Sequence, residues 1–140
     1  MLQLEHLNLV VKDIDASVEF YRTAFPHWRI RGQGTGEWYG KARRWLHFGD
    51  DYQYLTFNDD GEEPIRDGAG HQVGVSHFAY VTDDLAGIRK RLLEAGYQIH
   101  SEGNPTDYRQ NVYFVDPAGF EVEFVQYYSD QPQLRNQYSQ

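Results

Sequence analysis

The chain has 140 residues, of which 40% are hydrophobic, so it can build one compact domain or two very small ones. Thirteen Lys and Arg against twenty-one Asp and Glu give a net charge of -8, which disfavours binding to nucleic acid or to anionic membranes. No apolar run approaches the ~18 residues that cross a bilayer, and the first residues lack a signal-peptide pattern, so we expect a cytoplasmic protein.

The chain contains no cysteine, which excludes disulfides, thiolate nucleophiles and Cys-ligated metals. Any metal must therefore be held by His, carboxylate, amide or phenol groups. Aromatic residues make up 16% of the chain and suit a core, a subunit interface or a small-molecule cleft equally well.

An internal repeat organises the sequence, because residues 4–25 and 75–96 superpose with His6 on His77. Each copy has a histidine in an extended apolar run, then an acidic pair, then a helix-like pattern. Asp13 or Asp15 is predicted to cap the first helix, and Asp83 or Asp84 the second.

Further strands are predicted after each helix. In chain order the predicted strands are 4–11, 28–31, 44–48 and 52–57, then the apolar run around His77, 97–100, 111–115 and 120–125. The glycine-rich segment 32–36 is predicted to be a flexible loop rather than a dinucleotide-binding turn.

These elements predict an α+β fold of two βαβββ modules, residues 1–58 and 73–127, followed by a tail over 128–140 that can include a short helix. An acidic, glycine-rich linker over residues 58–70 separates the modules. Each half is too small to form a large core alone. We therefore expect the modules to pack into an open, curved sheet around a central cleft.

The repeat also predicts a site, because His6 and His77 occupy equivalent places. Aligning the last hairpins pairs Tyr54 with Glu123, which gives a symmetric set of His6, Tyr54, His77 and Glu123. A glutamate facing the cleft needs a cation. Two imidazoles and a carboxylate form a triad with open positions that suits Fe(II), Mn(II), Ni(II) or Zn(II). The alternative is a pair of structural histidines with a solvated glutamate.

The chain resembles the vicinal oxygen chelate superfamily, which includes glyoxalase I, bleomycin-resistance proteins, fosfomycin-resistance transferases and extradiol dioxygenases. The residues that carry the resemblance are Glu5-His6-Leu7, the helix segment 15–21, Ser76-His77-Phe78-Ala79 and the segment 113–123 with its Asp-Pro-x-Gly turn. The resemblance implies one divalent metal ion held by His6, His77 and Glu123. It also implies a homodimer, and a functional tyrosine near the metal at Tyr113.

The chain departs from individual branches of this superfamily. Glyoxalase I has a second glutamate where this sequence has Tyr54, so the three-ligand pattern is closer to the fosfomycin transferases and the extradiol dioxygenases. Gly103, Asp107 and Asn111 stand where the transferases carry phosphonate-binding residues. For the acid–base histidine of the dioxygenases, His47 and His71 are only candidates.

We therefore expect a divalent-metal-dependent enzyme acting on a small molecule, with isomerase or lyase, transferase and dioxygenase chemistry all open. Glu123 and Tyr113 are the expected catalytic residues, and Tyr113 would donate a hydrogen bond or a proton to a developing oxyanion. Tyr54, Asn8 and Asn111 are expected to line the substrate cleft. The alternative is a protein of the same fold that binds a flat drug or metabolite between aromatic rings without reaction.

Overall fold

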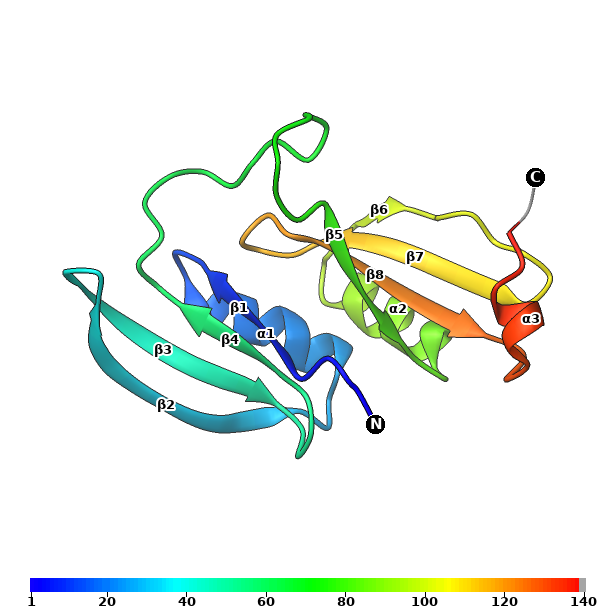
Figure 1. The fold of residues 1–140 in the computed structure, drawn as a ribbon, viewed down its shortest axis with the longest axis horizontal. Coiled ribbons are helices and arrows are strands. Elements are labelled where there is room, and N and C mark those ends of the chain that lie inside the picture. Colours follow the sequence, from blue (N-terminus) through cyan, green and yellow to red (C-terminus); the bar gives the residue numbers. More distant parts are fainter. Residues whose placement is uncertain (139–140) are drawn as a thin grey trace. The chain divides into compact units, whose positions relative to one another are not determined.

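The computed structural model describes residues 1–138. The chain divides into two compact units, Met1–Ile65 and Arg66–Gln140. In each unit a strand, a helix and three further strands follow one another along the chain, and the four strands form one sheet (Figure 1). The predicted α+β fold of two βαβββ modules is therefore confirmed. Residues 139 and 140, the end of the predicted tail, lie outside the described residues.

The first unit is formed by β1 (His6–Val10), α1 (Ile14–Ala24), β2 (Arg29–Trp38), β3 (Lys41–Gly49) and β4 (Tyr54–Asn58). Its strand order is β1-β4-β3-β2. β1 runs parallel to β4, and the other neighbouring strands are antiparallel. The order places β1 and β4, distant in sequence, side by side.

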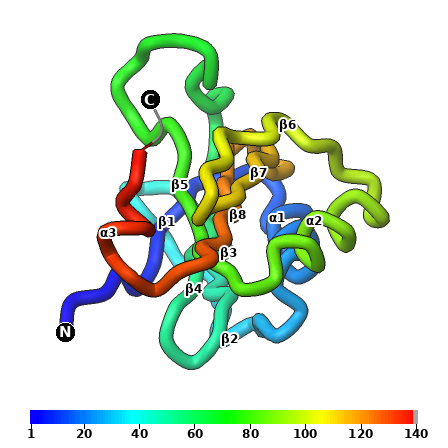
Figure 2. The backbone as a smooth tube through the Cα atoms, turned by 90° about the vertical axis from the view of Figure 1, so that its right-hand side faces the viewer, coloured from blue at the N-terminus to red at the C-terminus, as the bar shows by residue number. Residues whose placement is uncertain are grey.

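The second unit has the same topology, with β5 (His77–Val81), α2 (Leu85–Glu94), β6 (Ile99–Ser101), β7 (Arg109–Val115) and β8 (Glu121–Tyr127). Its strand order is β5-β8-β7-β6, and β5 is parallel to β8. Figure 2 follows the long connection from β4 to β5. A short helix, α3 (Pro132–Arg135), lies within the predicted tail.

Both long helices begin at an aspartate that caps the first turn. The Asp13 side chain accepts a hydrogen bond from the Ala16 amide, and the Asp84 side chain accepts one from the Gly87 amide, each at 3.0 Å. The structure thus selects one residue from each acidic pair. The capping bonds satisfy amide groups that have no partner inside the helix.

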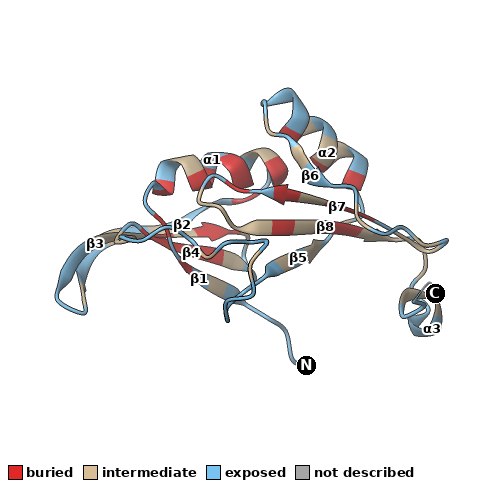
Figure 3. Ribbon diagram, turned by 90° about the horizontal axis from the view of Figure 1, so that it is seen from above, coloured by how far each residue is buried: buried red, intermediate tan, exposed pale blue. Residues whose placement is uncertain are grey.

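Each of the two long helices has a buried apolar stripe, and Figure 3 marks the buried positions along α1 and α2 in red. The buried stripes are Ile14, Val18 and Tyr21 in α1, and Leu85, Ile88 and Leu92 in α2. In the first unit the Tyr21 ring lies 6.0 Å from the Phe57 ring of β4. Burial of these side chains is the main contribution to the stability of each unit.

The prediction of a flexible loop at residues 32–36 is wrong, because this segment is part of β2. It pairs with β3 in register from Gly32 opposite His47 to Gly36 opposite Arg43. Glycine weakens an isolated strand, but here the Trp45 ring of β3 covers Gly32 and Gly34. Contacts from the neighbouring strand outweigh the low strand propensity of glycine.

Among the described residues, no helix has the length and apolarity that crossing a membrane requires.

Candidate functional site

Strand alternation gives the first sheet one polar and aromatic face. Side chains two residues apart share a face of a strand, while the residues between them, such as Leu46 and Leu55, are buried in the core. The polar face carries His6 and Asn8 from β1, Arg43, Trp45 and His47 from β3, and Tyr54, Thr56 and Asn58 from β4. With Trp38 of β2, these residues line a cavity of about 320 Å³. Such a volume fits a small organic molecule.

Four rings follow one another across this cavity. The Trp45 and His47 ring centroids are 5.1 Å apart, those of His47 and Tyr54 4.7 Å, and those of Tyr54 and His6 4.7 Å. The guanidinium of Arg31 lies 4.3 Å from the Tyr54 ring centroid. The stack fixes the orientation of both histidines.

Glu5 holds the His6 imidazole from outside the cavity. His6 Nδ1 lies 2.8 Å from Glu5 Oε1, and the Tyr54 hydroxyl donates a hydrogen bond to the same oxygen at 3.3 Å. The hydrogen bond with His6 lowers the pKa of Glu5, which therefore stays ionised. With Nδ1 engaged, Nε2 is the His6 nitrogen that can serve as a metal donor.

His47 is neutral at neutral pH. Burial lowers the pKa of His47, and the positive charges of Arg31 and His6 lower it further. A neutral imidazole can accept a hydrogen bond from a ligand, which makes His47 the better candidate of the two histidines considered for acid–base work.

The second sheet brings together His77, Glu123 and Tyr113. His77 Nε2 lies 3.3 Å from Glu123 Oε1, and the Tyr113 ring meets the His77 ring edge-on at 5.2 Å between centroids. β7 and β8 pair Tyr113 directly with Glu123. The Glu123 side chain is only 13% exposed. The structure thus gathers three predicted site residues on one face of one sheet.

A second carboxylate faces the other nitrogen of His77. Glu121 Oε1 lies 3.8 Å from His77 Nδ1, and Glu121 Oε2 lies 3.5 Å from His100 Nε2. His77 therefore has Glu121 on its Nδ1 side and Glu123 on its Nε2 side. This arrangement parallels His6, whose Nδ1 faces Glu5.

Tyr113 keeps its proton over a wide pH range. Burial, together with a hydrogen bond to Glu123 and the negative charge of that carboxylate, raises the pKa of Tyr113 to about 12. The phenol is therefore a hydrogen-bond donor at neutral pH rather than a base.

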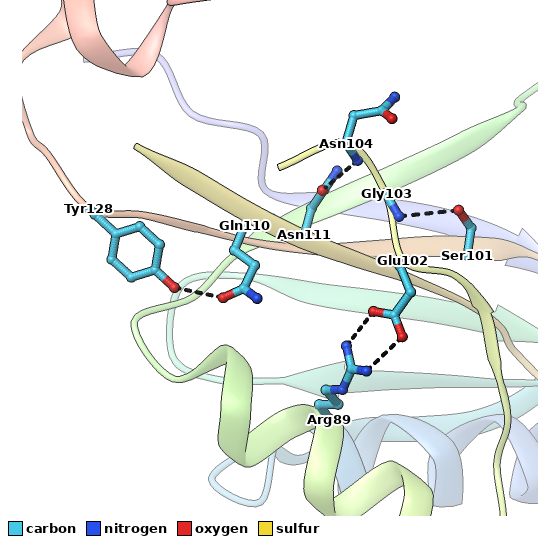
Figure 4. A network of polar contacts seen from close by, with 8 residues as sticks. All are labelled: Arg89, Ser101, Glu102, Gly103, Asn104, Gln110, Asn111 and Tyr128. Carbon is cyan, nitrogen blue, oxygen red and sulfur yellow. Dashed lines mark hydrogen bonds and ion pairs between the residues drawn. The ribbon is translucent and has the colours of Figure 1, made fainter. Parts of the chain in front are cut away.

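Asn111 connects Glu123 to the loop after β6, and Figure 4 shows its contact with Asn104 in that loop. Its Nδ2 donates to Glu123 Oε2 at 3.4 Å, and its Oδ1 accepts from the Asn104 amide at 3.1 Å. Gly103 makes this packing possible, because its φ is +75° and a Cβ there would overlap the Asn111 side chain. Asn111 is thus held in place to orient the Glu123 carboxylate.

The predicted pairing of Tyr54 with Glu123 is wrong. The parallel ladders place Tyr54 opposite His6 and Glu121 opposite His77, so Glu121 is the counterpart of Tyr54. The antiparallel pairing leads to the same assignment. Glu123 lies opposite Tyr113 of β7, and Thr56 lies opposite His47 of β3, so Thr56 is the counterpart of Glu123. The sequence alignment of the two strands was therefore two residues out of register.

Of the residues expected in the substrate cleft, Tyr54 and Asn8 line the cavity of the first unit, whereas Asn111 belongs to the second unit. Sequence reasoning named His47 only as a candidate acid–base residue and missed the part of the lining formed by Trp38, Arg43, Trp45, Thr56 and Asn58. The alternation of Arg43, Trp45 and His47 could have revealed it. Within neither unit do three His, Asp or Glu side chains of the described residues form a group that could hold a metal ion.

Comparisons with known proteins agree with this architecture. A solved glyoxylase/bleomycin resistance protein/dioxygenase domain from Frankia sp. EAN1pec is similar, with 17% identity, a TM-score of 0.74, and coverage of 98% of this chain and 99% of that one. An antibiotic-binding protein from Streptomyces sp. CB03234 has 20% identity, a TM-score of 0.63, and coverage of 91% and 97%.

A mutant of the genomically encoded fosfomycin resistance protein from Listeria monocytogenes, complexed with Mn(II) and 1S,2S-dihydroxypropylphosphonic acid, has 16% identity and a TM-score of 0.66, with coverage of 98% and 99%. The comparison with curated proteins gives no match. The family model that describes the Glyoxalase/Bleomycin resistance protein/Dioxygenase superfamily matches residues 3–124. The chain therefore belongs to the Glyoxalase/Bleomycin resistance protein/Dioxygenase superfamily.

Proposed function

We propose that the protein is a divalent-metal-dependent enzyme acting on a small molecule, with His6, His77 and Glu123 as metal ligands. The observation that carries this proposal is the environment of the two imidazoles. Each has a carboxylate on its Nδ1 side, which leaves Nε2 as the donor atom. Metal-binding histidines are commonly oriented by a carboxylate in this way.

The donor atoms of the second unit fit a single ion. Nitrogen and oxygen ligands of one divalent ion each lie about 2.0–2.2 Å from it, so two of them are within about 4 Å of each other. His77 Nε2 and Glu123 Oε1, which are 3.3 Å apart, would meet this condition. Imidazole and carboxylate donors suit Fe(II), Mn(II), Ni(II) and Zn(II) alike, so the donor set leaves the metal open.

A divalent ion held by these residues would supply Lewis-acid polarisation of neighbouring oxygens on a substrate. Tyr113, which stays protonated, would donate a hydrogen bond or a proton to an oxyanion that develops beside Glu123. Asn111 would keep the Glu123 carboxylate in place through its hydrogen bond. Isomerase or lyase, transferase and dioxygenase chemistry are all compatible with these roles.

Elemental analysis of purified and reconstituted protein tests the proposal. We expect about one metal ion per chain in the wild type and a loss of at least ~10-fold in affinity in Glu123→Gln, because a ligand is removed. Fe or Mn would favour dioxygenase or transferase chemistry, and Ni, Zn or Co would favour isomerase chemistry.

Glu121→Gln is the matched control for this experiment. It removes a carboxylate on the same strand and face but leaves the Nε2 side of His77 unchanged. We expect a smaller loss of metal affinity than in Glu123→Gln. Metal that is retained by Glu123→Gln but lost from Glu121→Gln would contradict the assignment of ligands.

The second candidate is a non-catalytic protein that binds a drug or metabolite. It is favoured by the cavity lined with aromatic rings in the first unit, and an antibiotic-binding protein shares the fold. A survey of catechols, hemithioacetals and epoxides separates the two candidates. Metal-dependent turnover supports the enzyme, whereas ligand binding that a chelator leaves unchanged, without turnover, supports the binding protein.

We also propose the homodimer and the cytoplasmic location that the sequence predicts. Sedimentation of the purified protein tests the first of these, and the mass of a single chain in solution would contradict it.

A further inference from the structure

The residues that line the cavity of the first unit have the charge pattern of an anion-binding site. Nine residues line it, and Arg43 is the one permanently charged residue among them. No carboxylate belongs to the lining, although Asp and Glu outnumber Lys and Arg in the chain. A lone cation in a concave surface attracts negatively charged ligands.

Two donor atoms of Arg43 have no acceptor among the described residues. These atoms, Nε and Nη1, are buried. The Arg43 guanidinium lies over the Trp38 ring, 4.5 Å from the ring centroid, which limits its movement. Buried N–H groups of a charged side chain are costly to leave without an acceptor, so Arg43 has unused hydrogen-bonding capacity at the cavity that it lines.

The remaining lining favours a flat, apolar body on the ligand. The rings of Trp45, His47, Tyr54 and His6 follow one another across the cavity. Aromatic faces bind planar ligands by stacking and by excluding water. Asn58 also belongs to the lining, and its buried Oδ1 has no hydrogen-bond partner within the part of the chain that the structure describes.

We infer that this cavity binds an aromatic carboxylate, with the carboxylate on Arg43 and the ring system against the aromatic part of the lining. The inference rests on the proposed function, in that it takes the cavity as the place of the small-molecule substrate. A guanidinium binds a carboxylate through charge-assisted hydrogen bonds, which are stronger than bonds between neutral groups.

Arg44 offers a matched control because it follows Arg43 in sequence, but its guanidinium already has hydrogen-bond partners within the protein. Its Nη1 lies 3.1 Å from Asp15 Oδ1 of α1, and its Nη2 donates to Gln33 Oε1 at 3.1 Å. Arg44 does not belong to the cavity lining. Arg43→Gln and Arg44→Gln therefore change the net charge equally, but only the first removes a cavity donor.

The test is a titration of chelator-treated protein with 2-naphthoate and with the neutral 2-naphthamide, followed by NMR of the tryptophan indole N–H signals. The chain has three tryptophans. Trp38 and Trp45 line the cavity, while Trp28 is buried in the core against Phe25 and Phe48. We expect naphthoate to shift the signals of Trp38 and Trp45 and to leave that of Trp28 in place.

We expect naphthamide to bind about ten-fold more weakly than naphthoate, which corresponds to one charge-assisted hydrogen bond. Arg43→Gln should weaken naphthoate binding by a similar factor, Arg43→Lys by less, and Arg44→Gln by less than about two-fold. The dispersion of the amide spectrum shows whether each variant is folded.

Equal affinities for naphthoate and naphthamide would overturn the inference, as would equal losses in the two glutamine variants. No shift at ~1 mM naphthoate would also overturn it. Because the protein is free of metal in this titration, the result does not depend on the ligand set of His6, His77 and Glu123. Loss of metal in Glu123→Gln tests the proposed function separately.

Discussion

The imidazole of His6 lies almost flat on the phenol ring of Tyr54, with 4.7 Å between ring centroids and 13° between ring planes. The two residues are also direct partners in the parallel ladder between β1 and β4. The same phenol stacks on His47 and lies beneath Arg31. Tyr54 is therefore placed to orient His6 by its ring, whether or not its oxygen binds a metal.

This relationship predicts different effects for two substitutions of Tyr54. Tyr54→Phe keeps the ring and should leave metal affinity within about three-fold of the wild type, whereas Tyr54→Ala frees the imidazole and should weaken it by about ten-fold. Calorimetric titration with Mn(II) or Co(II) measures both. A large loss in Tyr54→Phe would instead show that the hydroxyl oxygen is a ligand.

Gly103 controls the position of Asn111, and through it that of Glu123. Gly103→Ala introduces a Cβ into the space of the Asn111 side chain at a backbone φ of +75°, so we expect a lower stability and a weaker metal affinity. Asn111→Ala should weaken metal affinity without the backbone strain. Thermal unfolding and metal titration of both variants separate the two effects.

An unchanged metal affinity in both variants would show that Asn111 does not orient Glu123. Gly36→Ala is the control for the loss of a glycine, because a Cβ at Gly36 meets no atom within 4 Å.

Tyr113 should ionise at much higher pH than an ordinary tyrosine. Burial and Glu123 raise the pKa of this phenol to about 12, so in the metal-free protein it should remain protonated at pH 10.5, where an exposed tyrosine is largely ionised. The ¹³Cζ signals of labelled tyrosine follow the ionisation, and Tyr113→Phe identifies the signal. Glu123→Gln replaces a charged hydrogen-bond acceptor by a neutral one and should lower the pKa of Tyr113.

Asp50 is predicted to stabilise the turn between β3 and β4 in a pH-dependent way. Its Oδ1 accepts the Tyr52 and Gln53 amides at 2.8 Å each. Burial raises the pKa of Asp50, but these hydrogen bonds and nearby positive charges outweigh burial and lower it overall. We expect Asp50→Ala to reduce the free energy of unfolding by about 1–2 kcal/mol at pH 7.

Because the folded pKa of Asp50 lies below the unfolded value, this contribution is complete above about pH 4 and is lost as the pH falls through the folded pKa. Urea unfolding at pH 7 and pH 3 should therefore show a smaller difference between wild type and variant at pH 3. Asp51→Ala, which removes an exposed ion pair with Arg29, is the control and should change little. A difference that does not depend on pH would contradict the role of the ionised carboxylate.

The sequence allowed the elements with regular apolar spacing to be predicted. The stripes of α1 and α2 and the capping aspartates follow directly from helical periodicity and side-chain hydrogen bonding. β2 could not be predicted over its full length, because its glycines are stabilised by Trp45 of the neighbouring strand rather than by their own propensity.

The second unit holds His77, Glu123 and Tyr113 on one face because strand alternation alone decides which way these side chains point. The cavity of the first unit was harder to predict. The strand predicted from residue 44 begins one residue after Arg43, so the face that Arg43 shares with Trp45 and His47 was not recognised. Register between strands, which sequence spacing does not fix, also decides that Thr56 rather than Tyr54 corresponds to Glu123.

The contact between Gly34 and Trp45 has a consequence for how ligand preference can change in this family. An added Cβ at Gly34 would lie 3.0 Å from the Trp45 ring, so the indole rests on bare backbone instead of on another side chain. A substitution at this position, on a residue that does not itself line the cavity, would tilt the indole and reshape the space beside Arg43. Mutagenesis libraries aimed at ligand preference should therefore include the residues of β2 that support the lining as well as the lining itself.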